Sequence, residues 1–302
     1  MNIIKFRKFW LTLSVTMVIV SIPLIILFRL PMGIDFTGGT LIEIKPKDQI
    51  SVTDLRNRVG ETTEKTVQVQ QSGDNQFILR VNISDNDQSK AFENKIKEKL
   101  PDSEIVRREN IGTTVSASTT TRAIYGLVLA SILIIMYLAY AFRQVPRSVS
   151  SWTFGTIAIL TLIHDLSSTF AIYCILGRIL GYELDINALV AALTILGFSV
   201  HDTIVVFDRI RENIIKNPQK SFFQNANSSV NQTFARSLNT SLTAILVLVS
   251  MLILGGSTIK PFILILALGI GIGTYSSIFI AAPSLAMWFE YRNKNNKRVK
   301  IQ

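Results

Sequence analysis

The sequence contains one cysteine and two histidines in 302 residues, and only 17% of its residues are charged. A single cysteine, Cys174, excludes disulfide bonds within the chain, CxxC redox chemistry and zinc sites built from several thiolates. The sequence also lacks a Ser-His-Asp triad pattern, an HExxH motif and a phosphate-binding P-loop. We therefore expect no enzymatic activity, no metal and no cofactor.

Long apolar runs dominate the chain, which is 48% hydrophobic with a mean hydropathy of +0.37. A helix needs about 20 mostly apolar residues to cross a membrane. Six runs meet this requirement, at residues 9–28, 123–142, 152–176, 186–207, 236–256 and 262–289. The first is too long for a cleavable signal peptide, and Leu30-Pro31-Met32 has no small-residue cleavage pattern. We predict a polytopic α-helical membrane protein with six transmembrane helices.

The formal net charge of +10 is unevenly distributed. Residues 31–121 carry 14 acidic and 12 basic groups, whereas the other segments are strongly basic. Lysine and arginine gather after every second span, on the side that also holds both termini and the basic tail 291–302. By the positive-inside rule, both termini face the cytoplasm of a bacterial cytoplasmic membrane. The charge then reflects topology, and we expect no nucleic-acid binding.

Residues 31–121, between the first and second spans, are predicted to form one small external domain. Strand and helix periodicities alternate there: strands at 40–44, 66–71, 76–81 and 104–108, and helices at 51–61 and 87–100. The hairpin turn falls on Ser72-Gly73-Asp74-Asn75. The order βαββαβ predicts a ferredoxin-like α+β domain. Residues 1–30 and 122–290 then form the first helix and a five-helix bundle.

Ionisable side chains inside the predicted spans are few and costly, at about 2.5–3.5 kcal/mol each. His164-Asp165 lies within the third span and His201-Asp202 within the fourth. Arg236 begins the fifth span, at a depth that allows it to pair with Asp202. In the alternative interpretation, Arg236 extends to the cytoplasmic interface and the histidines are ordinary core residues.

Small residues mark two further segments. Gly33-Ile34-Asp35-Phe36-Thr37-Gly38-Gly39 is expected to form a rigid turn between the first helix and the first strand, or else a docking site for a partner. Gly269, Gly273 and Ser277 lie on one face of the sixth span, which favours close helix packing.

The chain resembles the SecD/SecF family of bacterial protein-export membrane proteins, on the SecF side, and through it the resistance-nodulation-division superfamily. The resemblance rests on the following segments: Gly33–Gly39 (GIDFTGG), His164-Asp165, Gly197–Asn213 (GFSVHDTIVVFDRIREN), Arg236–Ser241 (RSLNTS) and Gly273–Pro283 (GTYSSIFIAAP). They include Ser199, Asn239 and Thr240 as motif positions, and together they span nearly the whole sequence.

This resemblance implies a subunit that joins SecD and assists export of preproteins at the SecYEG channel with the proton motive force, with YajC as a further candidate partner. It also implies that Asp202 and Arg236 take part in proton passage, with Asp165 accessory. The sequence departs from the family at His201 and Phe198, where Asn and Tyr are usual. Two alternatives stay open: a self-contained proton-coupled exporter of small molecules, and a passive scaffold for SecD.

Overall fold

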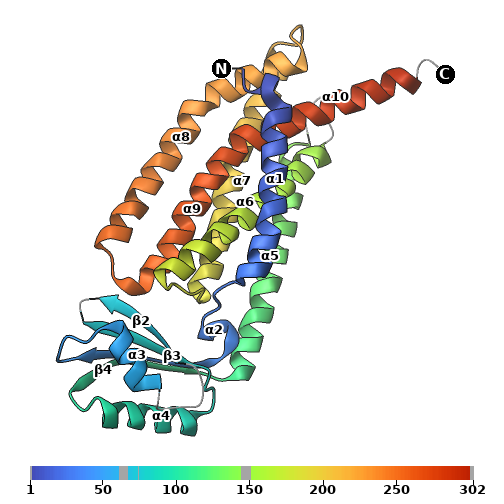
Figure 1. The fold of residues 1–302 in the computed structure, drawn as a ribbon. Coiled ribbons are helices and arrows are strands. Elements are labelled where there is room, and N and C mark those ends of the chain that lie inside the picture. Colours follow the sequence, from blue (N-terminus) through green and yellow to red (C-terminus); the bar gives the residue numbers. More distant parts are fainter. Residues whose placement is uncertain (1, 61–66, 74, 144–150, 300–302) are drawn as a thin grey trace.

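The fold comes from a computed structural model, which describes residues 2–60, 67–73, 75–143 and 151–299. The expectations for Asp74 and for residues 61–66 and 144–150 lie outside the described residues. Six helical segments are long and apolar enough to cross a membrane, which agrees with the predicted number of spans. A small α+β domain lies between the first and second of them in the chain, and both chain ends lie at the opposite end of the molecule (Figure 1).

The spans are longer than the apolar runs that predicted them. They comprise α1 (Arg7–Phe28), α5 (Thr113–Ala141), α6 (Ser151–Leu180), α7 (Ile186–Lys216), α8 (Phe222–Leu254) and α9 (Lys260–Ser276), which continues into α10 (Ala282–Val299). The fifth span was expected to start at 236, but α8 starts at Phe222 because polar residues extend it as a hairpin with α7. The start of α5 at Thr113 likewise means that its first turns belong to the region assigned to the external domain.

The hairpin between α7 and α8 is held by polar side chains. Asn213 Nδ2 donates to Ser229 Oγ at 2.7 Å, and Arg209 Nε donates to Gln232 Oε1 at 2.6 Å. Ser221 and Gln224 form a capping box at the start of α8, in which each side chain accepts from the other's backbone amide. These contacts fix the register of the two helices, which becomes important for the functional site.

The sixth span changes its winding at residues Ser277–Ala281, which form a π-helical turn between α9 and α10. Pro283 has no amide hydrogen, so a carbonyl one turn earlier loses its helical partner. A single π turn near such a missing backbone hydrogen bond bends the helix. In Figure 1, α10 accordingly leaves the bundle at an angle to α9.

The domain predicted to be external has the expected ferredoxin-like α+β fold. Strands β1 (Gly39–Pro46), β2 (Val67–Gly73), β3 (Gln76–Val81) and β4 (Ser103–Ile111) form an antiparallel sheet of order β2-β3-β1-β4. Helices α3 (Val52–Gly60) and α4 (Asn86–Lys99) lie on one face. The core between them includes Ile42, Leu55 and Ile96, each fully buried.

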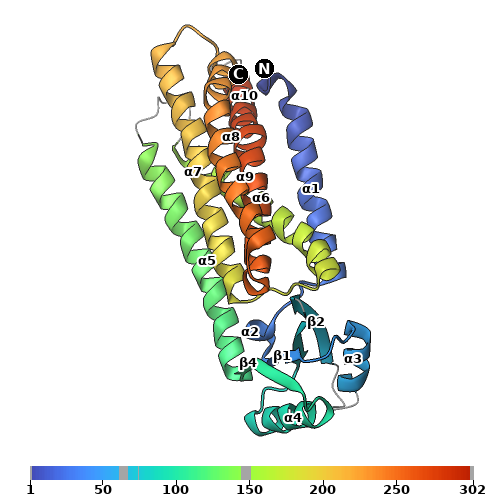
Figure 2. The same ribbon diagram turned by 90° about the vertical axis from the view of Figure 1, so that its left-hand side faces the viewer.

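The other face of the sheet is turned toward the membrane bundle (Figures 1 and 2). A short helix, α2 (Ile34–Thr37), follows α1 and leads into β1. Within the bundle, α6, α7 and α9 contribute most of the buried positions, among them Ala191, Ile195 and Ile265, each with no exposed surface. Polar groups on the buried faces of these helices are therefore enclosed by protein rather than by lipid.

Candidate proton-coupling site

Asp165 is fully buried at the centre of the bundle and is satisfied from three helical segments. Its Oδ2 atom accepts from Ser199 Oγ of α7 at 2.5 Å and from Ser276 Oγ at the end of α9 at 2.8 Å. Its Oδ1 atom lies 3.0 Å from His164 Nδ1 on α6. Hydrogen bonds of this kind stabilise a buried carboxylate, and they connect α6 with both central helices.

Asp202 is the second buried carboxylate, with 4% of its surface exposed, and it is less well satisfied. Ser277 Oγ lies 3.5 Å from its Oδ2 atom, at the limit of a hydrogen bond. The hydroxyl of Ser237 on α8 is also buried and lies close to the Asp202 carboxylate, but it forms no hydrogen bond of normal geometry with a described residue. The bundle thus holds two buried carboxylates, and Asp165 accepts more and shorter hydrogen bonds than Asp202. The adjacent serines Ser276 and Ser277 contact one carboxylate each.

The small residues of α9 make this arrangement possible. A Cβ atom added to Gly269 would lie 2.2 Å from Ile195 Cδ1, and one added to Gly273 would lie 3.1 Å from Ser199 Cβ. The face of Gly269, Gly273 and Ser277 therefore packs directly on α7, as expected for a small-residue stripe. Close approach of the two helices brings Ser276 and Ser277 within reach of Asp165 and Asp202.

The two histidines differ in their surroundings. His164 is 3% exposed and contacts Asp165, and its Nε2 atom is buried without a hydrogen-bond partner in the described part of the chain. His201 precedes Asp202 but is exposed on the outside of α7. The structure thus brings His164 into the buried site and leaves His201 at the surface of the bundle.

Arg236 is exposed on α8 and makes no ion pair with Asp202 or with any other described residue. Its depth still matches that of Asp202, since Asp202 lies fourteen residues before the end of α7 and Arg236 fourteen residues after the start of α8. The expected pairing is therefore not formed in this conformation, in which Asp202 is buried and Arg236 is exposed.

The glycine-rich segment Gly33–Gly39 has an unusual backbone conformation and contacts the start of α7. Gly38 and Gly39 have φ angles of 73° and 139°, which L side chains rarely adopt. Asp35 Oδ2 accepts from the amide of Ile186, the first residue of α7, at 2.8 Å. Gly33 donates its amide to the carbonyl of Leu184 at 2.8 Å. The glycine-rich segment therefore anchors the start of α7 as well as the start of β1.

Comparison with known proteins supports one family. Residues 91–291 match the model described as "Protein export membrane protein SecD/SecF, C-terminal", and residues 24–50 match the "SecD/SecF GG Motif". The chain belongs to the SecD/SecF family. A protein translocase subunit SecF from Thermobaculum terrenum is 37% identical, with 99% of this chain and 96% of the relative covered. The SecF of Anaerolinea thermophila is 34% identical, with 97% and 96% covered.

Solved structures of the SecD/SecF family share the fold. A crystal structure of SecDF from Thermus thermophilus, titled a translocon-associated membrane protein, matches with a TM-score of 0.82 and 27% identity over 96% of this chain. A second crystal structure, of SecDF in a super-membrane-facing form, matches with a TM-score of 0.70 and 27% identity over 99% of this chain. The chain spans about 40% of the length of these SecDF chains.

The SecD/SecF motifs therefore coincide with the structural features described above. Gly33, Asp35, Gly38 and Gly39 lie in the matched GG motif and form the turn at the outer end of α7. Exposed motif positions include Gly197 and His201 on α7 and Arg236, Asn239 and Thr240 on α8.

Three residues with contacts at the site or between the two parts of the molecule were not predicted as site residues. Ser276 adjoins the predicted Ser277, and its role depends on the π turn that follows α9, which periodicity does not reveal. Arg80 of β3 and Glu183 of the α6–α7 loop form an ion pair at 3.1 Å across the two parts of the molecule. About a hundred residues separate Arg80 and Glu183 in the chain, so no local sequence pattern predicts that they pair. Among the described residues, no group of acids, histidines and cysteine has the arrangement of a metal site.

Proposed function

We propose that the chain acts as the SecF-type subunit of a SecDF complex and uses the proton motive force to assist protein export at a SecYEG channel. The observation that carries this proposal is a buried pair of intramembrane carboxylates, Asp165 and Asp202, of which only Asp165 is well satisfied. A weakly supported buried carboxylate exchanges protons more readily than one held by several donors.

Asp202 is proposed to be the residue that takes up and releases the proton in each cycle. When it is ionised it attracts Arg236, which lies at the same depth on α8; when it is protonated that attraction is lost. Asp165 and His164 act as accessory groups that hold α6 against α7 and α9. A proton crossing about 100 mV supplies about 2.3 kcal/mol, which is enough to bias two helix arrangements.

The partner is proposed to be a SecD-type subunit that covers the exposed face of α7 and α8. This face carries His201, Arg236, Asn239 and Thr240, which are exposed in the isolated chain. Charged and polar groups at this depth require protein or water around them. The limited length of the chain relative to solved SecDF chains leaves room for such a partner.

The orientation is proposed from the charges in the short segments between spans. Both termini face the cytoplasm and the α+β domain lies outside a bacterial cytoplasmic membrane, because lysine and arginine concentrate at the terminal end. The preprotein and, as a further partner, YajC would meet the complex at the channel. A self-contained exporter is the competing function; it predicts substrate efflux by this chain without a SecD-type subunit.

The deciding experiment compares Asp202→Asn with wild type in membrane vesicles that contain the partner subunit and the channel. Asn has nearly the same shape as Asp but cannot cycle a proton. We expect normal co-purification with the partner and loss of the gradient-dependent part of export. Asp208→Asn, at an exposed position on the same helix, is the matched control. Unchanged stimulation in Asp202→Asn would instead support a passive scaffold.

A further inference from the structure

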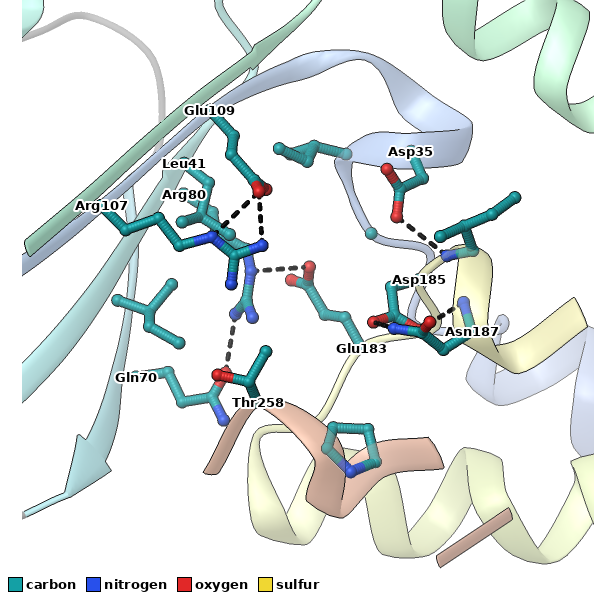
Figure 3. A pocket seen from close by; sticks show the side chains of 15 residues that line it. Asp35, Leu41, Gln70, Arg80, Arg107, Glu109, Glu183, Asp185, Asn187 and Thr258 are labelled. Atoms are coloured by element: carbon teal, nitrogen blue, oxygen red, sulfur yellow. Dashed lines mark hydrogen bonds and ion pairs between the residues drawn. The ribbon is translucent and has the colours of Figure 1, made fainter. Parts of the chain in front are cut away.

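The external domain and the outer end of α7 meet through polar contacts around a cavity of about 190 Å³ (Figure 3). Arg80 of β3 crosses this boundary, and its Nε atom lies 3.1 Å from Glu183 Oε2. Both side chains are largely enclosed, with 16% and 13% of their surface exposed. Arg80 Nη1 also donates to Gln70 Oε1 at 2.7 Å, which fixes the guanidinium from the side of the domain.

Backbone contacts hold the same loop from the side of α1. The amide of Leu184 donates to the carbonyl of Pro31 at 2.6 Å, and the amide of Gly33 donates to the carbonyl of Leu184 at 2.8 Å. A side chain at Gly33 would place its Cβ atom 2.8 Å from that carbonyl oxygen, so only glycine allows this approach. The Glu183 segment is therefore fixed on one side by backbone pairing and on the other by Arg80.

The loop continues directly into α7. Asp185 caps the helix by accepting from the amides of Asn187 and Ala188 at 3.0 and 3.3 Å, and Asp35 accepts from the amide of Ile186. From Ile186 to Asp202 the helix is unbroken. At 1.5 Å per residue, about 24 Å of rigid helix joins the loop to Asp202.

We propose that Arg80 and Glu183 form a joint that transmits movements of α7 to the external domain, and that both are positioning residues for the proton-driven cycle. This inference rests on the proposed function. A displacement of α7 at Asp202 reaches Glu183 through the helix, and the ion pair carries it into β3. The cavity beside the ion pair leaves space for the domain to pivot, which a close-packed apolar interface would resist.

The energetics favour such a role over simple stabilisation. A largely enclosed ion pair repays its desolvation only when its geometry is good, so it adds little stability relative to apolar residues of similar size. It does select one orientation of the two parts. Removing one partner leaves the other charge enclosed and unpaired, and the external domain then loses its defined orientation.

The test uses the full chain assembled with its SecD-type partner in vesicles, with spin labels at Asn94→Cys on α4 and Leu254→Cys at the outer end of α8. Both positions are exposed, and the native Cys174 is fully buried. Distance distributions are measured with and without a proton gradient. Export is measured on the same variants without the labels.

We expect Arg80→Gln and Glu183→Gln each to broaden the distance distribution and to remove its response to the gradient, with loss of most of the gradient-dependent export. The exchanged variant Arg80→Glu with Glu183→Arg restores both readouts. Arg107→Gln is the matched control, because Arg107 lines the same cavity but pairs with Glu109 on its own strand. It should leave the distances and export unchanged.

The joint is refuted if either single variant keeps the wild-type distances and gradient response, or if the exchanged variant folds and fails to restore them. Asp202→Asn is measured in parallel. Loss of the gradient response in Asp202→Asn, together with a wild-type response in Arg80→Gln, overturns the joint alone. A gradient response that survives Asp202→Asn overturns the proposed function. The spin-label distances measured without a gradient still decide whether Arg80 and Glu183 orient the domain.

Discussion

Ser199 donates a hydrogen bond of 2.5 Å to Asp165 and thereby connects α6 to α7 less than one helical turn from Asp202. Ser276 donates to the same carboxylate oxygen from α9. One atom of Asp165 is thus the meeting point of three helices. A change at Asp202 that moves α7 or α9 must stretch or break one of these bonds, so the two carboxylates are mechanically linked.

Removing either donor should destabilise the bundle. Ser199→Ala and Ser276→Ala each leave the buried Asp165 with one hydrogen bond fewer, at an expected cost of about 1–3 kcal/mol. Cys174 is the only thiol in the sequence and is fully buried, so reaction with a thiol-specific dye on heating reports unfolding. Ser250→Ala is the control, because Ser250 is exposed and bonds only to its own helix.

The double variant Ser199→Ala with Ser276→Ala should lose less stability than the two single losses together. With both serine donors removed, only His164 remains beside the carboxylate of Asp165. A buried carboxylate with so few donors takes up a proton instead of remaining charged, which limits the total cost. Strictly additive losses would contradict the shared role of the Asp165 oxygen.

The fold followed from the sequence because its signals are local. Apolar runs of sufficient length identified all six spans, and alternation of periods identified the βαββαβ order. The end of α7 and the start of α8 were missed because these extensions are polar and are stabilised by contacts between the two helices, such as that of Asn213 with Ser229. Hydropathy detects only the part of a helix that contacts lipid or the core.

The site was predictable to a smaller extent. Asp165 and Asp202 were predicted as site residues because charges inside apolar runs are rare, and both are buried in the structure. Their partners depend on helix rotation, which the sequence does not specify: Arg236 turned outward, whereas Ser276 turned toward Asp165. The ion pair of Arg80 with Glu183 joins distant segments and required the three-dimensional structure.

Gly269→Ala should destabilise the packing of α9 on α7. The added Cβ atom would lie 2.2 and 2.4 Å from two carbons of Ile195, which is fully buried and has little room to move. Overpacking of this kind costs about 1–3 kcal/mol. The Cys174 dye assay should therefore show a lower unfolding temperature, and Ile195→Ala in the same chain should restore part of the loss.

Gly271→Ala provides the matched control on the same helix. Its nearest side-chain atom, Ile245 Cδ1, would lie 3.9 Å away, an ordinary contact. Alanine is the better helix former by about 1 kcal/mol, so this variant should be neutral or slightly stabilised. Equal losses at Gly269 and Gly271 would show that the close approach to Ile195 is not the cause.

Asp185→Asn should increase stability in a pH-dependent manner. Burial raises the pKa of Asp185, and the charge of Asp35 acts in the same direction, against hydrogen bonds from Asn187 and Ala188. A carboxyl group with a raised pKa in the folded state favours folding at low pH, and this contribution is lost as the pH rises through that value. Asn keeps the helix cap but has no charge.

The gain from Asp185→Asn should therefore be absent below about 4, the ordinary range of Asp, grow as the pH rises toward the folded-state pKa, and be complete above it. Thermal unfolding of wild type and variant across this pH range measures it. Asp85→Asn serves as the control, because it is the same Asp-to-Asn substitution at the exposed N-cap of α4. A gain that is largest at low pH would refute the assigned sign.

A photo-crosslinking residue at Thr240 should capture the SecD-type partner. Thr240 is exposed on α8 one turn from Arg236, and its hydroxyl bonds only to the Arg236 carbonyl, so its replacement disturbs little. Leu129 on α5 is 57% exposed, and Val128, Ile132 and Leu133 on the same helix are exposed as well, as expected for a lipid-facing helix. The same probe at Leu129 should give no adduct with the partner. If the partner is captured at Leu129 and not at Thr240, the polar face of α7 and α8 is not the interface, and the exposure of Arg236 needs another explanation.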